Sequence, residues 1–262
     1  MGPRPGGGRV TWERLRAVVN RDAGDLWPPQ AAGAGCCTVC RGAAQPGYAR
    51  CYQCGAHRDG APGMLADAVV PISYAVKGDG HAARLRLYKT DTPGAAAAGG
   101  SLQALMLVFL HDHALCIWRY AAMPPPTRLA VVPSGQGRPG AHPLLGLLSP
   151  SLALRPVTLA VRPGEHLGRE LNPRRFRAES PLPGASVLLV DDTWVSGASA
   201  QSATVALRAA GACHVAVVVL GRHVDPVDPH SRRLCSAFQA TSYDPGACAV
   251  HTVAALADYP VA

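Results

Sequence analysis

The 262-residue chain has few charged residues, few aromatic residues and two lysines. Charged residues make up 16% and aromatic residues 5%, whereas 48% of the residues are hydrophobic. This balance excludes bulk disorder and leaves enough apolar side chains for one sizeable core plus a small appendage. No apolar run reaches the roughly 18 residues of a membrane span, since the best run, residues 102–110, ends at His111. The first residues also lack the apolar stretch of a signal peptide, so we expect a soluble cytoplasmic protein that does not bind membranes.

The basic residues outnumber the acidic residues and give a formal net charge of +8. All of them except Lys77 and Lys89 are arginines, in a chain rich in Ala, Gly and Pro, which is typical of a high-G+C coding bias. They are scattered, and the longest cluster is residues 174–177. We therefore favour an ordinary solvated surface, with a nucleic-acid-binding patch as the alternative.

Hydrophobic periodicity predicts an α/β protein with a parallel sheet flanked by helices. The predicted units are a flexible and helical segment (1–34), a cysteine module (35–60) and one α/β domain (61–262). Strands are predicted at residues 69–75, 128–133, 157–161, 186–190 and 214–220, helices at 12–19, 80–90, 101–119 and 199–211, and loops at 92–100 and 223–230. The continuous apolar run at residues 215–220 is typical of a strand buried on both faces of a parallel sheet.

Five of the nine cysteines lie close together, and their spacing predicts a metal site. Cys37-x2-Cys40 and Cys51-x2-Cys54 form two knuckles, which together supply four thiolates for one tetrahedral, structural Zn²⁺. Cys36 is an alternative to Cys37 as the first ligand. A pair of redox-active CxxC motifs is the alternative to zinc, but such motifs usually begin a helix beside a βαβ unit.

The other four cysteines are dispersed: Cys116, Cys213, Cys235 and Cys248. Without a secretory signal, we do not expect disulfides. Cys248-x2-His251, with Cys235 upstream, is either half of a second metal site or, as we favour, a buried cysteine beside a surface histidine. The zinc module either packs on the main domain, which we favour, or contacts nucleic acid.

Residues 186–199 contain the most informative motif: a buried strand, two aspartates, a turn of small residues and a helix start. In α/β sheets, ligands bind just beyond the carboxyl ends of the strands. Backbone N–H groups of the turn and the helix N-terminus suit a phosphate, and Gly197 allows close approach. Asp191 and Asp192 can accept hydrogen bonds from sugar hydroxyls or hold Mg²⁺ through water. A bare strand–turn–helix with surface aspartates is the alternative.

This motif resembles the phosphoribosyl pyrophosphate (PRPP) signature of the type I phosphoribosyltransferases. Over residues 36–222 the chain is similar to ComF-type proteins, which join a four-cysteine zinc module to such a domain. The Tyr-Lys segments around Lys77 and Lys89 and the Arg169-x2-Asn172 segment also fit the resemblance. The resemblance implies that PRPP is bound by Asp191, Asp192, Thr193, Val195, Ser196, Gly197, Ala198, Ser199, Lys77 and Lys89. Ordinary exposed lysines are the alternative for the last two.

The resemblance implies a Mg²⁺-dependent transfer of the 5-phosphoribosyl group to a nitrogen acceptor, with release of pyrophosphate. Asp191, Asp192, Arg138 and Arg169 would be the catalytic residues, the arginines neutralising charge on the leaving group. The family's flexible loop carries aromatic and amide residues that are replaced here by Pro, Gly and His. Either two histidines, His142 and His166, supply the polar contacts, or turnover is reduced or absent.

Two other functions stay open. One is a non-catalytic PRPP or nucleotide sensor, or a competence-type protein of DNA uptake that binds nucleic acid. The other is a degenerate transferase fold used in assembly. The acceptor and the oligomeric state are not predicted by the sequence.

Overall fold

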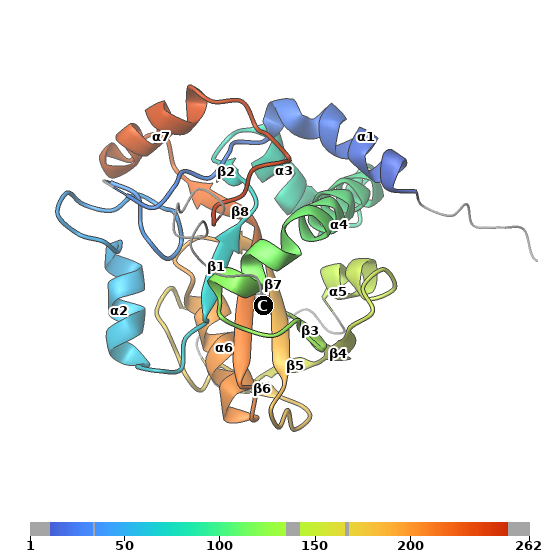
Figure 1. The fold of residues 1–262 in the computed structure, drawn as a ribbon, viewed down its shortest axis with the longest axis vertical. Coiled ribbons are helices and arrows are strands. Elements are labelled where there is room, and N and C mark those ends of the chain that lie inside the picture. The colour runs from blue at the N-terminus through green and yellow to red at the C-terminus, as the bar shows by residue number, and fades with distance from the viewer. Residues whose placement is uncertain (1–10, 34, 135–141, 166–167, 251–262) are drawn as a thin grey trace, which may run out of the picture.

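The computed structural model describes residues 11–33, 35–134, 142–165 and 168–250. Its centre is a parallel sheet in the order β1-β8-β7-β3-β4, with β2 pairing with β8 after β1 ends (Figure 1). The strands of this sheet are β1 (Ala68–Pro71), β2 (Tyr74–Val76), β3 (Arg128–Val131), β4 (Arg155–Val157), β7 (Ser186–Trp194) and β8 (His214–Val224). The predicted α/β class with a parallel sheet is confirmed.

Both faces of the sheet are covered, which explains the uninterrupted apolar runs of its central strands. Along β7, Leu188 and Val190 pack into one core cluster, whereas Val187 and Leu189 pack into the other. The first face carries α1 (Trp12–Asp22), α3 (Gly80–Leu87), α4 (Ala95–Tyr120) and α5 (Pro143–Leu148). The second face carries α6 (Ala198–Ala209), a hairpin of β5 (Leu159–Val161) and β6 (Phe176–Ala178), and buried cysteines of residues 37–54. Figure 1 shows α1, α3 and α4 gathered together.

Helix α4 is long and apolar enough to cross a membrane by length and composition alone. In the structure, 56% of its most apolar window is buried, and its apolar residues belong to the main core cluster. Packing against the sheet therefore accounts for its hydrophobicity. The prediction of a loop at residues 92–100 is wrong from Ala95 onward, because the run of alanines favours helix strongly enough to outweigh Gly99 and Gly100.

Two predicted strands are each divided in the structure. The predicted strand at residues 69–75 forms β1 and β2, and the one at 157–161 forms the end of β4 and then β5, which leaves the sheet to pair antiparallel with β6. The prediction of a loop at residues 223–230 is wrong at its start. His223 and Val224 extend β8 because they pair with Ala75 and Val76 of β2.

The structure also contains short elements that periodicity did not predict. These are α2 (Tyr52–Gly60), α5, β6, α7 (Arg232–Gln239) and the 3₁₀ turns Ala23–Asp25 and Pro229–Ser231. Helix α2 begins next to Cys51 and carries Cys54, so it belongs to the cysteine module.

The strand order reverses direction between β3 and β7. After β3 the next strand of the sheet is β4 on one side, whereas after β7 the chain passes through α6 to β8 on the other side. Neighbouring strands whose connections diverge leave a ligand crevice at their carboxyl ends. The aspartate pair of β7 lies at this edge of the sheet.

Candidate functional site

Two buried carboxylates lie near the carboxyl end of β7. Asp191 and Asp192 are only 9% and 6% exposed. The Tyr88 hydroxyl donates to Oδ2 of Asp192, and the Lys89 ammonium forms an ion pair with the same oxygen. His142 Nε2 lies 3.7 Å from that oxygen. Side chains from the end of α3 and the start of α5 thus converge on one carboxylate.

The neighbouring carboxyl group, that of Asp191, has a raised pKa. Burial first of all, and then the negative charge of Asp192, raise the pKa of Asp191 to about 8, although Lys89 and backbone N–H groups act in the opposite direction. In the free protein at neutral pH, Asp191 therefore holds its proton. A ligand that binds the ionised pair must release it, so binding should strengthen as the pH rises toward 8.

This pKa predicts how Asp191→Asn changes stability. The folded state keeps the Asp191 proton up to a pH of about 8, whereas the unfolded chain releases it near 3.8, so the free energy of unfolding falls as the pH rises between these values. Asparagine does not titrate, so the variant does not show this decrease in the free energy of unfolding. We expect the difference in Tm, variant minus wild type, to grow from pH 5 to pH 8, as measured by thermal unfolding.

Asp225→Asn is the control, because the pKa of Asp225 is shifted in the opposite direction from that of Asp191. The hydrogen bond from Lys77 lowers the pKa of Asp225, so its contribution to stability is present at neutral pH and is lost only on acidification. Asp225→Asn should not raise the Tm at pH 8. An Asp191→Asn difference that stays constant or shrinks with pH contradicts the buried, protonated carboxyl.

The turn between β7 and α6 brings backbone N–H groups to the same edge. Gly197 caps α6 with a φ of +82°, and a Cβ at this position would overlap the buried indole ring of Trp194. Both the backbone conformation and the space require glycine. Ser196 Oγ accepts a hydrogen bond from the Ala198 N–H at 3.3 Å. The first turn of a helix lacks intrahelical acceptors, so this N-terminus suits an anion.

Arg175 lies buried beside this turn. Its Nη1 donates to Ser199 Oγ at 3.0 Å, and its Nη2 donates to the carbonyls of Gly168 and Glu170 at 2.8 and 3.0 Å. Burial lowers the pKa of Arg175. The sequence pattern indicates a solvated surface for residues 174–177 and does not predict this role of Arg175, because the local signal is limited to the adjacent Phe176, which is buried in β6.

Lys77, predicted to bind PRPP, and Arg169, predicted to be catalytic, have other surroundings. Lys77 forms an ion pair with Asp225 at 2.9 Å, with much of its side chain exposed. Arg169 is exposed and close enough to His223 to add to the lowering of its pKa, which burial dominates. The roles of Lys77 and Arg169 stay predictions.

Of the other predicted residues, the structure describes some and not others. Thr193 is half-buried and in register with Gly221 of β8, and Val195, next to the turn, is 45% exposed. Arg138, His166 and His251 lie outside the described residues.

The four predicted zinc ligands form one cluster. The sulfur atoms of Cys37, Cys40, Cys51 and Cys54 lie within 4.8 Å of one another, and Cys40 Sγ is 3.8 Å from Cys51 Sγ. Tetrahedral zinc with Zn–S bonds of about 2.3 Å requires sulfurs roughly 3.8 Å apart, so the cluster fits the ion. Hydrogen bonds from the other three thiols, together with the charge of Arg222, hold the pKa of Cys40 well below its usual range. This favours a thiolate at Cys40, whereas hydrogen bonds with the other thiols of the cluster raise the pKa of Cys51 and of Cys54.

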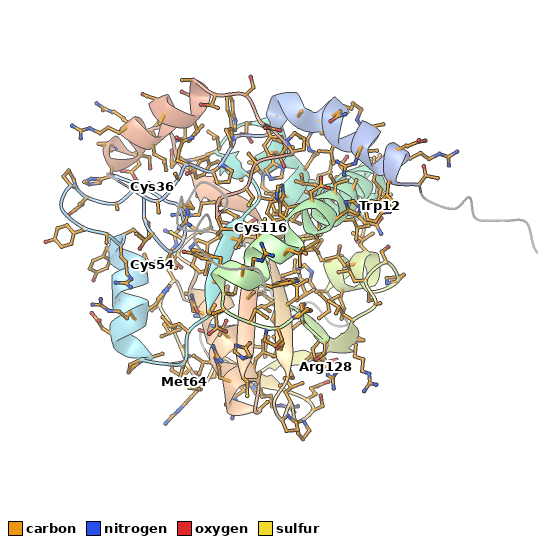
Figure 2. The ribbon with its side chains drawn as sticks, in the orientation of Figure 1. Trp12, Cys36, Cys54, Met64, Cys116 and Arg128 are labelled. Carbon is orange, nitrogen blue, oxygen red and sulfur yellow. The ribbon has the colours of Figure 1, made fainter. Side chains whose placement is uncertain are left out.

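Cys36 does not belong to the cluster. Its thiol donates to the carbonyls of Gln30 and Arg41 at 3.7 and 3.6 Å, and burial raises its pKa to about 11. The alternative with Cys36 as first ligand is therefore not supported. Figure 2 labels Cys36 on the loop near α7 and Cys54 at the start of α2.

Arg222 connects the cysteine cluster to the turn after β7. Its Nη1 donates to the Trp194 carbonyl at 3.2 Å, and its guanidinium fills the space where a side chain of Gly42 would lie. Burial disfavours its charge, but the Cys40 thiolate outweighs that effect and raises the pKa of Arg222. Arg222 thus contacts both the charged cysteine cluster and the backbone just before the turn.

Comparisons with known proteins add little. No family model and no curated protein matches the chain. Among solved structures, the chain is similar to a purine phosphoribosyltransferase from Pyrococcus horikoshii Ot3, with 14% identity and a TM-score of 0.29, over 48% of this chain and 89% of that chain. A likeness at this level carries no argument, so the function is argued from the site itself.

Proposed function

We propose that the protein binds PRPP at the carboxyl edge of β7 and transfers its 5-phosphoribosyl group to a nitrogen acceptor, with release of pyrophosphate. One observation carries the proposal: two buried carboxylates, a glycine turn and a helix N-terminus follow one another at the carboxyl end of β7, where the strand order reverses. A phosphate on the turn leaves the ribose hydroxyls beside the carboxylates and directs the pyrophosphate toward the loop after β3.

Each residue group has a role in this proposal. The 5′-phosphate accepts hydrogen bonds from the backbone of residues 195–199, and Arg175 fixes the hydroxyl of Ser199 beside it. Asp191 and Asp192 accept hydrogen bonds from the two ribose hydroxyls, which displace the Tyr88 hydroxyl from Asp192. Breaking the bond between the anomeric carbon and pyrophosphate needs positioning and positive charge more than covalent chemistry.

Positive charge for the leaving group comes from Lys89, with His142 beside it. Mg²⁺ would enter with PRPP, and Asp191 and Asp192 could hold it through water. The ion would supply positive charge that offsets the charge on the departing pyrophosphate.

Pyrophosphate release tests the transfer. The purified protein is mixed with PRPP and Mg²⁺ and offered ammonia, purine bases or orotate as acceptors. We expect one acceptor to give release at least about 100-fold faster than with the Asp191→Asn/Asp192→Asn variant, the size of effect typical for removing transition-state stabilisation. Release that is equal in both proteins contradicts the assignment.

A second candidate is a PRPP or nucleotide sensor without turnover. The observation that favours it is the satisfied state of Asp192, whose carboxylate already has a hydroxyl and an ammonium as partners. This candidate predicts PRPP binding with no pyrophosphate release from any acceptor. Its nucleic-acid version predicts DNA affinity that falls steeply with salt, since phosphate contacts release counterions.

The two lysines give a direct prediction for the ligand site. Lys89 contacts Asp192, whereas Lys77 is held on the surface by Asp225. We expect Lys89→Gln to weaken PRPP binding by about 10-fold or more, as for the loss of one charge-assisted contact. The loss from Lys77→Gln should be smaller. Titration calorimetry measures the PRPP affinity of both variants. A larger loss of affinity in Lys77→Gln would contradict the assignment of Lys89 and indicate that the pyrophosphate binds near β2.

A further inference from the structure

A second group of metal-binding side chains lies away from the four-cysteine cluster. His113 and Cys116 are three residues apart on α4 and therefore share one face of the helix. Cys248, from the segment after α7, lies against them, and the ligand atoms of the three residues are all within 4.8 Å of one another. Figure 2 labels Cys116 on α4.

The orientation of His113 suits a metal ligand. Its Nε2 lies 2.7 Å from the carbonyl oxygen of Pro245, which can only accept a hydrogen bond. The ring proton is therefore on Nε2, and the lone pair is on Nδ1, which is buried. A backbone carbonyl that fixes the tautomer in this way is the usual outer contact of a metal-binding histidine.

Cys248 is held in place from both sides. Before it, Pro245 accepts the hydrogen bond from His113. After it, the carbonyl of Ala249 accepts hydrogen bonds from Nε and Nη2 of Arg41 at 3.2 and 3.1 Å. Cys248 itself is 4% exposed within the main core cluster, whereas Cys116 is half-buried. The ligands are thus positioned in advance, and the half-buried thiol gives an ion access.

We propose that His113, Cys116 and Cys248 bind a second metal ion of the zinc class. One imidazole and two thiolates are a soft to borderline donor set that favours Zn²⁺ over Mg²⁺ or Ca²⁺. Three protein ligands leave the fourth tetrahedral position to water or another exchangeable ligand. The ion would link α4 to the segment after α7, two parts of the chain that are far apart in the sequence.

Metal content tests the proposal. The full chain, expressed with zinc and desalted, should hold about two zinc ions, one for each tetrahedral donor set, by elemental analysis and native mass spectrometry. Cys116→Ser/Cys248→Ser should hold one. Cys213→Ser/Cys235→Ser removes the same number of thiols outside both clusters and should still hold two. His113→Gln, a milder change, should weaken retention of one ion against a chelator.

The spectrum of the Co²⁺-loaded protein gives an independent readout. The difference spectrum, obtained by subtracting the absorption of Cys116→Ser/Cys248→Ser from that of the wild type, should show the visible bands of tetrahedral Co²⁺ with thiolate ligands. One zinc ion per wild-type chain would overturn the proposal, as would equal metal content in wild type and the double variant. A Cys116–Cys248 disulfide, seen as a loss of two thiols, would overturn it too.

Discussion

Cys40→Ser, or removal of zinc by a strong chelator, is expected to unfold the cysteine module and destabilise the whole chain. Cys40 is 1% exposed and shares a core cluster with Val69 and Val217 of the central sheet. Structural zinc contributes about 10–16 kcal/mol of binding free energy that is also folding free energy. This matches or exceeds the roughly 5–15 kcal/mol by which a domain is stable. Thermal unfolding should show a much lower Tm or no folded protein.

Cys36→Ser is the matched control for Cys40→Ser. Cys36 is adjacent to the cluster and buried, but its thiol donates to two carbonyl groups, and a serine hydroxyl can donate in the same way. We expect a full complement of zinc and a small change in Tm. Zinc content and Tm that are the same in both variants contradict the four-cysteine site.

Gly197→Ala is expected to weaken PRPP binding by up to roughly 100-fold. The new methyl group would overlap the ring of Trp194, which is 1% exposed and fixed by the core, and the φ of +82° is unfavourable for alanine. Such strain is worth up to about 3 kcal/mol, or roughly 100-fold in affinity if the turn moves to relieve it. Calorimetric titration measures the affinity, and thermal unfolding measures the loss of stability.

Gly184→Ala separates the turn from general strain. Gly184 also has a positive φ, of +68°, but nothing lies within 4 Å of a Cβ at this position. The variant should lose some stability and retain its PRPP affinity. Equal losses of affinity in both glycine variants would show that the turn after β7 does not hold the phosphate.

The parts of the fold that the sequence predicts best have strong local signals. Strands β7 and β8 are continuous apolar runs, and α6 ends near Gly211, whose φ is +105°. Strands β2 and β5 overlap longer predicted strands, and their separation from β1 and β4 depends on their pairing partners, which periodicity does not show. Strand β6 is three residues long and exists because it pairs with β5, so periodicity did not predict it. The start of α4 was missed because two glycines were given more weight than four alanines.

The candidate site also contains residues that the sequence predicts and residues that it does not. The aspartates, the glycine turn and the four cysteines are contiguous motifs whose spacing carries their chemistry. Arg175 reaches the turn, and Tyr88 and His142 reach Asp192, through tertiary packing that spacing does not encode. Lys77 and Lys89 stand in similar Tyr-Lys surroundings in the sequence, and their partners in the fold distinguish them.

The most direct test of the account is calorimetric titration of PRPP with Mg²⁺ into the wild-type protein and the Asp191→Asn/Asp192→Asn variant at pH 8. We expect saturable binding of one PRPP by the wild type, weaker binding at pH 6.5 because the raised pKa of Asp191 favours its protonated form there, and loss of binding in the variant. A wild-type protein that binds no PRPP, or a variant that binds it as tightly as the wild type, would contradict the account.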